Sequence, residues 1–301
     1  MVPSRGRSLA LEKELFEATA QILWSGWIER DCSVAPALHG LGGHFDAGGL
    51  KAVFPKIVWQ SDGRAPSMGL LGDIESEVED VFSERWDVTD ARVVPEPDDL
   101  LLSNDARYFE RATILYADLS GSTRLVDSYH WEIAGEIYKA YLLCAAKIVR
   151  SLGGVISAYD GDRIMAVFIG DKQTSNAAKC GLQINWSVAN IINPALSAQY
   201  PDSGYVVKQV VGIDTSKIRA ARIGVRGGND LVWVGKAANY AAKLTECRSD
   251  YPTWATEDAF NKLANWAKFG GSPKQSMWKE FKWTAMNEIK VYGSNWWWKV
   301  E

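Results

Sequence analysis

The sequence predicts an α+β fold, because strands and helices follow one another without a regular strand–helix–strand repeat. Several long segments have apolar residues at three-to-four spacing, which is typical of amphipathic helices. Short apolar runs bounded by turn residues lie between these segments and predict strands. The chain has 301 residues, 47% of them apolar and 23% charged, which is enough for one large domain with an extension.

Composition and charge argue against several classes of protein. The formal net charge is −4, which disfavours a nucleic-acid binder. No apolar run reaches about 18 residues, so we expect no membrane-spanning helix and no membrane partner. The first residues lack the apolar core of a secretory signal. Four scattered cysteines without C-x-x-C spacing predict neither a zinc site nor a disulfide framework, so we expect a reduced, cytoplasmic setting.

The chain is expected to have three parts. Residues 1–67, which contain a helical pattern over 9–27, form an N-terminal extension of unclear role. The composition changes at Met68, which is a candidate for the biological start. Residues 68–107 are then a lead-in of helix and strand, and residues 108–301 form the main domain.

The main domain begins with its clearest pattern. Thr113–Ala117 is an apolar run that predicts a strand ending in Asp118. An amphipathic helix is expected over 129–152, and two glycines end it. Two apolar runs around the tight turn 160–163 predict a hairpin.

The remaining elements follow from the same two periodicities. The full set of predicted elements, in chain order, is a helix over 73–86, a strand over 113–117, a helix over 129–152, strands over 155–159 and 164–169, a helix over 174–192, strands over 205–214, 220–225 and 231–234, helices over 236–246 and 257–266, and strands over 278–286 and 288–300.

Asp118 and Asp162 are the candidate metal ligands. Asp118 ends a strand and Asp162 lies in a hairpin turn. Two converging carboxylates repel each other unless a cation lies between them. Hard oxygen ligands suit Mg²⁺ or Mn²⁺, and a metal pair can activate a hydroxyl and hold a triphosphate. The alternative is that both residues are ordinary turn acids.

The small residues after Asp118 predict a phosphate-binding loop. Backbone N–H groups in such a turn can surround phosphate oxygens. The residues expected to bind the substrate's phosphates here are Leu119, Ser120, Gly121, Ser122 and Thr123.

Several ordered motifs resemble the class III nucleotidyl cyclase domain. They are a strand followed by D-L-S-G-S-T, then G-G-x-x-x-x-x-x-G-D-x-x-M-A-V-F, then G-x-A-x-N-x-A-A-x-L. The resemblance implies a ferredoxin-like sheet with helices packed on it. It also implies that Asp118, Asp162 and the Leu119 carbonyl bind two Mn²⁺ or Mg²⁺ ions in each active site.

The resemblance further implies a homodimer whose active sites are shared between subunits. Asn239 would come from the second subunit and stabilise the ribose and the transition state. Lys243 stands where the family has arginine; it lies one helical turn from Asn239 but cannot form a bidentate fork. Lys290 is the candidate for a late-strand lysine that contacts the triphosphate.

Two departures from the family's purine cyclases predict a pyrimidine substrate. Ala158 stands where they have a base-reading lysine, and Val232 where they have a base-reading acid. Tyr159, Arg222 and Asp230 lie nearby in the sequence and are the candidate residues for a smaller base. A pocket that hydrogen-bonds a base edge strongly rejects a base that leaves its partners unmet.

The longer strings, among them LYADLSGSTRLVDSY and NDLVWVGKAANYAAKL, resemble the pyrimidine cyclases of the bacterial Pycsar anti-phage system. That implies a uridylate or cytidylate cyclase that makes cyclic UMP or cyclic CMP with Mn²⁺, and a separate effector protein that senses the product. UTP is the expected substrate and CTP the alternative. An adenylate cyclase, and a catalytically silent module that binds nucleotide, are the remaining alternatives.

Overall fold

The computed structural model describes residues 69–225 and 228–301. The predicted extension over 1–67, with its helix at 9–27, lies outside these residues. Within the described part, no helix has both the length and the apolar character needed to cross a bilayer.

One large mixed sheet forms the centre of the domain. Its strands are β1 (Asp87–Asp90), β2 (Asp105–Leu119), β3 (Val155–Asp160), β4 (Arg163–Phe168), β5 (Gln209–Val225), β6 (Gly228–Val234), β7 (Thr253–Thr256), β10 (Lys279–Trp283) and β11 (Ile289–Ser294). The order across the sheet is β10-β11-β7-β5-β2-β4-β3, with β1 beside β2 and β6 beside β5. A separate small hairpin pairs β8 (Phe269–Gly270) with β9 (Gln275–Ser276).

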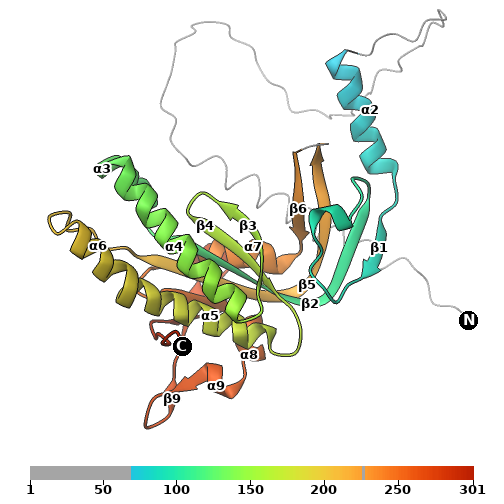
Figure 1. Ribbon diagram of the computed structural model, residues 1–301. Helices are drawn as coiled ribbons and strands as arrows, with labels where there is room; N and C mark the ends of the chain where they lie inside the picture. Colours follow the sequence, from blue (N-terminus) through green and yellow to red (C-terminus); the bar gives the residue numbers. More distant parts are fainter. Residues whose placement is uncertain (1–68, 226–227) are drawn as a thin grey trace, which may run out of the picture. The chain divides into compact units, whose positions relative to one another are not determined.

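Helices lie on both faces of this sheet (Figure 1), whereas α2 (Leu70–Ser83) buries none of its side chains. The other helices of the described residues are α3 (Ser122–Ser128), α4 (Trp131–Ser151), α5 (Gln173–Ser187), α6 (Asn193–Gln199), α7 (Lys236–Leu244), α8 (Glu257–Lys262) and α9 (Asn265–Lys268). The core under α4 and α5 contains Leu115, Ala117 and Ile164. The core under α7 contains Ile114, Met165 and Val167, which alternate with those residues along the strands. The described part of the chain is therefore α+β, as predicted.

The helix α7 lies unusually close to β5. A Cβ atom added to Gly212 would lie 2.1 Å from the carbonyl oxygen of Ala241. Only glycine therefore fits at position 212. Three small residues of α7, Ala237, Ala238 and Ala241, face the sheet and allow this contact.

The predicted break within 205–225 is wrong, because β5 is one continuous strand of 17 residues. Of the residues taken for a turn, Thr215 is buried, whereas Lys217 and Arg219 alternate to the exposed side of the strand. The Thr215 hydroxyl donates to the Ala112 carbonyl at 3.1 Å. The neighbouring Asp214 is also buried, and its carboxylate accepts a hydrogen bond from the Thr256 hydroxyl. The polar sequence here is an alternating strand and not a turn.

Other predicted boundaries also change. The first strand of the domain is β2, with 15 residues instead of five. The helix predicted over 129–152 is preceded by a separate helix, α3, and the helix over 257–266 is broken into α8 and α9. Helix α5 continues through a π-helical turn at Val188–Ile192 into α6. The short strand β7 was missed. Beyond Ser294 the predicted last strand is not a strand.

Candidate active site

Asp118 lies near the end of β2, on the face of the sheet that α7 covers farther along. Its neighbours Ala117 and Leu119 point into the core under α4 and α5. Side chains alternate along a strand, so Asp118 points to the opposite face. Tyr116 and Met165 are paired across β2 and β4 and share that face.

Asp162 comes close to Asp118 through the turn between β3 and β4. Gly161 has a φ of +60°, a backbone conformation that glycine adopts readily. Burial, together with the negative charge of Asp162, raises the pKa of Asp118 from 3.8 to about 6. The Oδ2 atom of Asp162 is buried and has no hydrogen-bond partner among the described residues.

These two carboxylates fit a divalent cation. A cation between the two carboxylates would give the buried Asp162 oxygen a partner. It would also lower the pKa of Asp118 toward its ordinary value. The described residues contain no cluster of three or more His, Cys, Asp or Glu side chains that could hold a metal. A metal here would therefore complete its oxygen ligands with backbone carbonyl, water or phosphate, which suits Mg²⁺ and Mn²⁺.

The predicted phosphate loop is shorter in the structure. The N–H of Ser120 donates to the Lys208 carbonyl at 2.9 Å, so it is not free for a phosphate. Gly121 has a φ of +79° and precedes α3, which begins at Ser122. Ser122 and Thr123 are thus the first residues of a helix. The backbone N–H groups after Asp118 that remain for a phosphate are therefore those at the start of α3.

Tyr116 and Arg163 belong to this site, and Tyr116 was not singled out from the sequence. The Arg163 guanidinium lies 5.4 Å from the centre of the Tyr116 ring, and its Nη2 atom lies 2.6 Å from a carboxylate oxygen of Asp160. Met165 pairs with Tyr116 on one side and with Ala158 on the other. The ring of Tyr116 therefore shares a face with Ala158, the position of the purine cyclases' lysine.

Tyr159, the predicted base-reading residue, points the other way. It pairs with Ile164, whose side chain lies in the core under α4 and α5. Residues directly opposite each other in a sheet share a face. Tyr159 is 53% exposed and lies on the face opposite Asp118. The chain does not bring these two side chains together.

Asn239 and Lys243 lie on the outer side of α7. Asn239 is exposed, whereas Ala238 and Ala241 face the sheet. The Lys243 ammonium group lies 3.8 Å from the Met286 sulfur. The Asn239 side chain is thus exposed and points away from the sheet of its own chain.

Three further candidate residues lie elsewhere. Arg222 bonds to the Asp98 carboxylate at 3.0 Å and the Leu100 carbonyl at 3.1 Å. It follows Ala221, which pairs with Ala106, so it lies beyond the opposite end of β2 from Asp118. Asp230 is in β6, next to this position. Lys290 is on β11, 3.5 Å from Glu280.

Comparison with known proteins gives close relatives of one kind. The chain is 44% identical over 234 residues to a uridylate cyclase of Xanthomonas perforans and 47% identical over 234 residues to one of Burkholderia cepacia. These alignments cover 78% and 77% of this chain, and 100% of each relative. A uridylate cyclase of Rhodovulum is 32% identical and is covered over 98% of its length.

Solved structures show the same fold at low identity. The adenylyl cyclase CyaB from P. aeruginosa matches with a TM-score of 0.52 at 17% identity, over 63% of this chain and 95% of that one. The guanylyl cyclase Cya2 matches with a TM-score of 0.53 at 15% identity, over 64% of this chain and 94% of that one. No model of a protein family matches the chain.

Proposed function

This chain belongs to the uridylate cyclase family and is a nucleotidyl cyclase, and we propose that it converts UTP to 3′,5′-cyclic UMP and diphosphate. The observation that carries the proposal is the acidic pair Asp118 and Asp162, with Tyr116 beside Ala158 on the same face as Asp118. The acidic pair supports the type of reaction. Tyr116, beside the alanine that replaces the purine cyclases' lysine, supports the preference for a pyrimidine base.

Asp118 and Asp162 would hold the divalent cations, Mn²⁺ or Mg²⁺, together with the Leu119 carbonyl. Bound there, the ions would lower the pKa of the ribose 3′-hydroxyl and offset the charge of the triphosphate. The 3′-oxygen attacks the α-phosphorus in line and its proton passes to solvent. The new bond joins O3′ to the α-phosphorus, the bond from that phosphorus to the bridging oxygen breaks, and diphosphate leaves.

A second copy of the chain would complete each site. Asn239 faces away from its own sheet, so it can reach only a site on another molecule. In this proposal the partner subunit's Asn239 hydrogen-bonds the ribose. The partner's Lys243 meets the charge that builds up on the phosphates in the transition state.

The base preference would depend on Tyr116. Its half-buried ring lies beneath the Arg163 guanidinium, which restricts the space beside Ala158. A purine would need that space, whereas a pyrimidine has one ring fewer. Asp160 lies 2.6 Å from Arg163, and this ion pair favours the position of the guanidinium above the ring.

Incubation with each of the four ribonucleoside triphosphates and Mn²⁺, followed by chromatography of the products, tests this function. We expect cyclic UMP as the main product, with less cyclic CMP. Faster cyclisation of CTP would make the chain a cytidylate cyclase, and faster cyclisation of ATP would contradict the pyrimidine assignment. No product from any nucleotide would favour a silent binding module.

We propose in addition that cyclic UMP serves in anti-phage defence and is sensed by a separate effector protein. The support for this role is the resemblance of the longer sequence strings to the pyrimidine cyclases of the bacterial Pycsar anti-phage system. Plating of phage on cells that carry the cyclase together with its effector protein, and on cells that lack the cyclase, tests it. Protection that survives replacement of Asp118 would show that defence does not need the cyclic nucleotide.

A further inference from the structure

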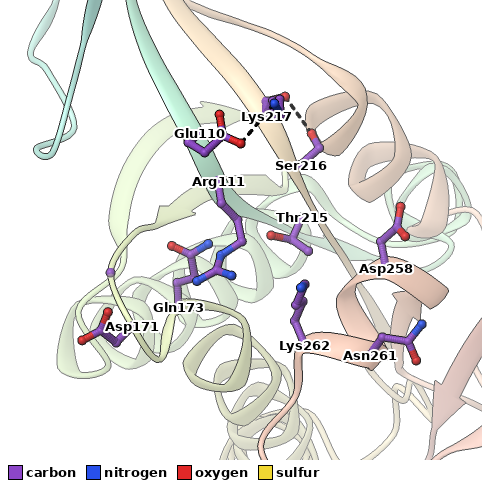
Figure 2. A pocket seen from close by; sticks show the side chains of 11 residues that line it. Glu110, Arg111, Asp171, Gln173, Thr215, Ser216, Lys217, Asp258, Asn261 and Lys262 are labelled. Carbon is purple, nitrogen blue, oxygen red and sulfur yellow. Dashed lines mark hydrogen bonds and ion pairs between the residues drawn. The ribbon is translucent and has the colours of Figure 1, made fainter.

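A polar pocket lies beside the middle of β2, next to the irregularity between Phe109 and Ala112. It has a volume of about 760 Å³, which is within the range of small-molecule sites, about 300–1,000 Å³. Its walls come from β2, β5, α8 and the start of α5 (Figure 2). Arg111 lies seven residues before Asp118, or about 23 Å along an extended strand. The pocket is therefore separate from the acidic pair.

The buried amide of Gln173 indicates that this pocket has a ligand. Gln173 is only 4% exposed, and its Nε2 atom has no hydrogen-bond partner in the described part of the chain. A buried donor without an acceptor is costly, and such groups in native proteins usually have a protein, water or ligand partner. Gln173 lines the pocket (Figure 2), so a bound acceptor could satisfy it.

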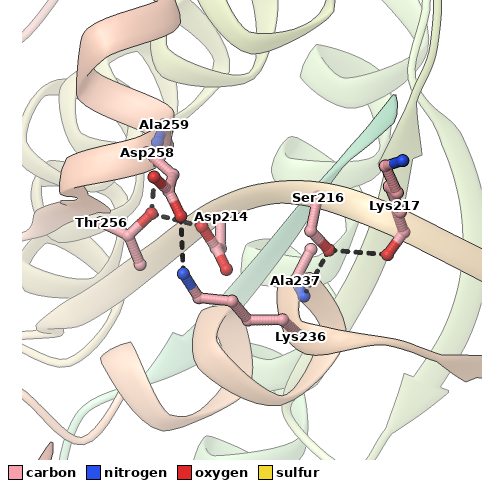
Figure 3. Close-up of polar contacts among 8 residues, drawn as sticks. All are labelled: Asp214, Ser216, Lys217, Lys236, Ala237, Thr256, Asp258 and Ala259. Atoms are coloured by element: carbon pink, nitrogen blue, oxygen red, sulfur yellow. Dashed lines mark hydrogen bonds and ion pairs between the residues drawn. The ribbon is translucent and has the colours of Figure 1, made fainter. Parts of the chain in front are cut away.

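The two hydroxyl groups at the pocket have already used their protons. Thr215 donates to the Ala112 carbonyl at 3.1 Å. Ser216 donates to the Lys217 carbonyl at 2.9 Å and accepts from the Ala237 N–H at 3.0 Å (Figure 3). Besides Asp171 and Asn261, the groups left for a ligand are donors: the Gln173 amide and the side chains of Arg111 and Lys262. These donors favour a ligand with acceptor oxygens.

The charges around the pocket favour an anion. Glu110 is engaged by Lys217 at 3.1 Å. Asp258 is engaged by Lys236 at 2.6 Å (Figure 3). Arg111 and Lys262 form no ion pair with any residue that the structure describes.

Asp171 is the remaining acid of the pocket wall, and it lies to one side of the other groups (Figure 2). The 15-residue helix α5 also begins at Gln173, so the positive end of its dipole is at the pocket.

We propose that this pocket binds a small molecule through a phosphate group. The pocket is approached by the Arg111 guanidinium, the Lys262 ammonium group and the Gln173 amide, and by the N-terminus of α5. This arrangement suits the several oxygens of a phosphate better than the two of a carboxylate. The ligand would contact β2, which carries Asp118, and would lie next to Ser216, which holds the first turn of the Asn239 helix.

Calorimetric titration of the full chain with inorganic phosphate, in EDTA to keep metals off the acidic pair, tests the proposal. We expect saturable binding of one phosphate per chain. Arg111→Gln should weaken it at least tenfold, and Lys262→Gln severalfold. Lys139→Gln is the matched control, because Lys139 is equally exposed on α4 and away from the pocket. Ribose 5-phosphate should compete with phosphate, whereas acetate should not.

Two further variants locate the site. Gln173→Leu removes the buried donor and should weaken phosphate binding, with a thermal melt to show that it folds. Asp118→Asn should leave phosphate affinity unchanged. Binding that falls with Asp118→Asn but not with Arg111→Gln would assign the phosphate to the acidic end and overturn the proposal. Absence of saturation up to about 10 mM phosphate, the weak end of specific affinities, would also overturn it.

Discussion

At one end of β2, burial and the nearby Asp162 raise the pKa of Asp118 to about 6, whereas Arg111, in the middle of β2, lies beside a pocket with Lys262 and Gln173. Both regions contain buried polar atoms without a partner among the described residues, among them Asp162 Oδ2 at the acidic end and Gln173 Nε2 at the basic pocket. The carboxylates suit a cation, and the cationic side chains of the pocket suit an anion.

The basic pocket and the acidic pair also differ in whether one chain supplies all of the residues expected at the site. The donors of the basic pocket all come from one chain. The acidic end has its carboxylates but lacks Asn239, which faces away on α7. The comparison predicts that catalysis depends on association of two chains, whereas phosphate binding does not.

The largest expected effect comes from removing one carboxylate of the acidic end. Asp118→Asn should lower cyclic UMP formation by about 10³-fold or more, because the metal contribution to such a reaction is worth several kcal/mol. The initial rate with UTP and Mn²⁺ measures it. Asp202→Asn, an exposed acid in a turn, is the control. Near-normal activity of Asp118→Asn would show that the acidic pair is not the metal site.

Asn239→Ala should lower the rate by about 10²-fold, the usual cost of losing one hydrogen bond to a transition state. The sharper experiment mixes this variant with Asp118→Asn. Each alone is nearly inactive, but half of the dimers in an equal mixture would contain one chain of each variant, and each such dimer would have one intact site. The mixture should regain about a quarter of normal activity if a two-fold dimer shares its sites. No recovery after subunit exchange would contradict the shared site.

A smaller effect is expected on the discrimination between pyrimidine and purine bases. Tyr116→Ala should lower the ratio of UTP to ATP turnover about tenfold, because the space beside Ala158 opens. The competing variant is Tyr159→Ala, on the other face of the sheet. Measurement of kcat/KM for both nucleotides separates the two tyrosines. A larger change with Tyr159→Ala would return the base-reading role to that residue.

The smallest effect concerns Asp214, which is opposite Ile114 and lies between the two ends of β2. Burial raises the pKa of Asp214 from 3.8 to about 6, and hydrogen bonds from Thr256 and Thr215 only partly oppose this. The folded state then binds a proton more tightly than the unfolded chain. The free energy of unfolding must therefore fall as the pH rises from about 4 to 6 and then level off.

Asp214→Asn removes this titration. Between pH 5 and pH 7.5 the variant should gain about 1 kcal/mol of stability relative to the wild type, since one pKa unit corresponds to about 1.4 kcal/mol. Urea unfolding at the two pH values measures the difference, with Asp202→Asn as control. A constant difference between variant and wild type would show that Asp214 does not titrate in this range.

The sequence was sufficient to predict most of the fold, because amphipathic helices and apolar strands depend on local periodicity. It failed where polar residues are buried. Residues 215–219 resemble a turn, but Thr215 and Ser216 form hydrogen bonds with Ala112 and Ala237, which are distant in the chain. Contacts between distant residues were not needed to predict the fold class, the helices α4 and α7, or the β3–β4 hairpin.

The candidate site was predictable in part for the same reason. Asp118 and Asp162 each mark the end of a local pattern, and the structure brings them together. The direction of a tyrosine depends on strand register, which one sequence does not reveal. Tyr159 was therefore named as the base-reading candidate, and Tyr116 was not considered. Arg222 has its partners in the lead-in, Asp98 and Leu100, and such contacts have no local signal.

The contact between Gly212 and Ala241 has a practical consequence for engineering. It fixes the height of α7 above the sheet, and even a methyl group at position 212 would collide with the helix backbone. A library that seeks a new base preference can vary Ala158, which lies on β3, separated from β5 by two strands. Tyr116 is paired directly with Gly212, so a larger side chain there would press on the same contact. Gly212 itself should stay, because a shift of α7 would displace Asn239, the residue proposed to complete the partner's site.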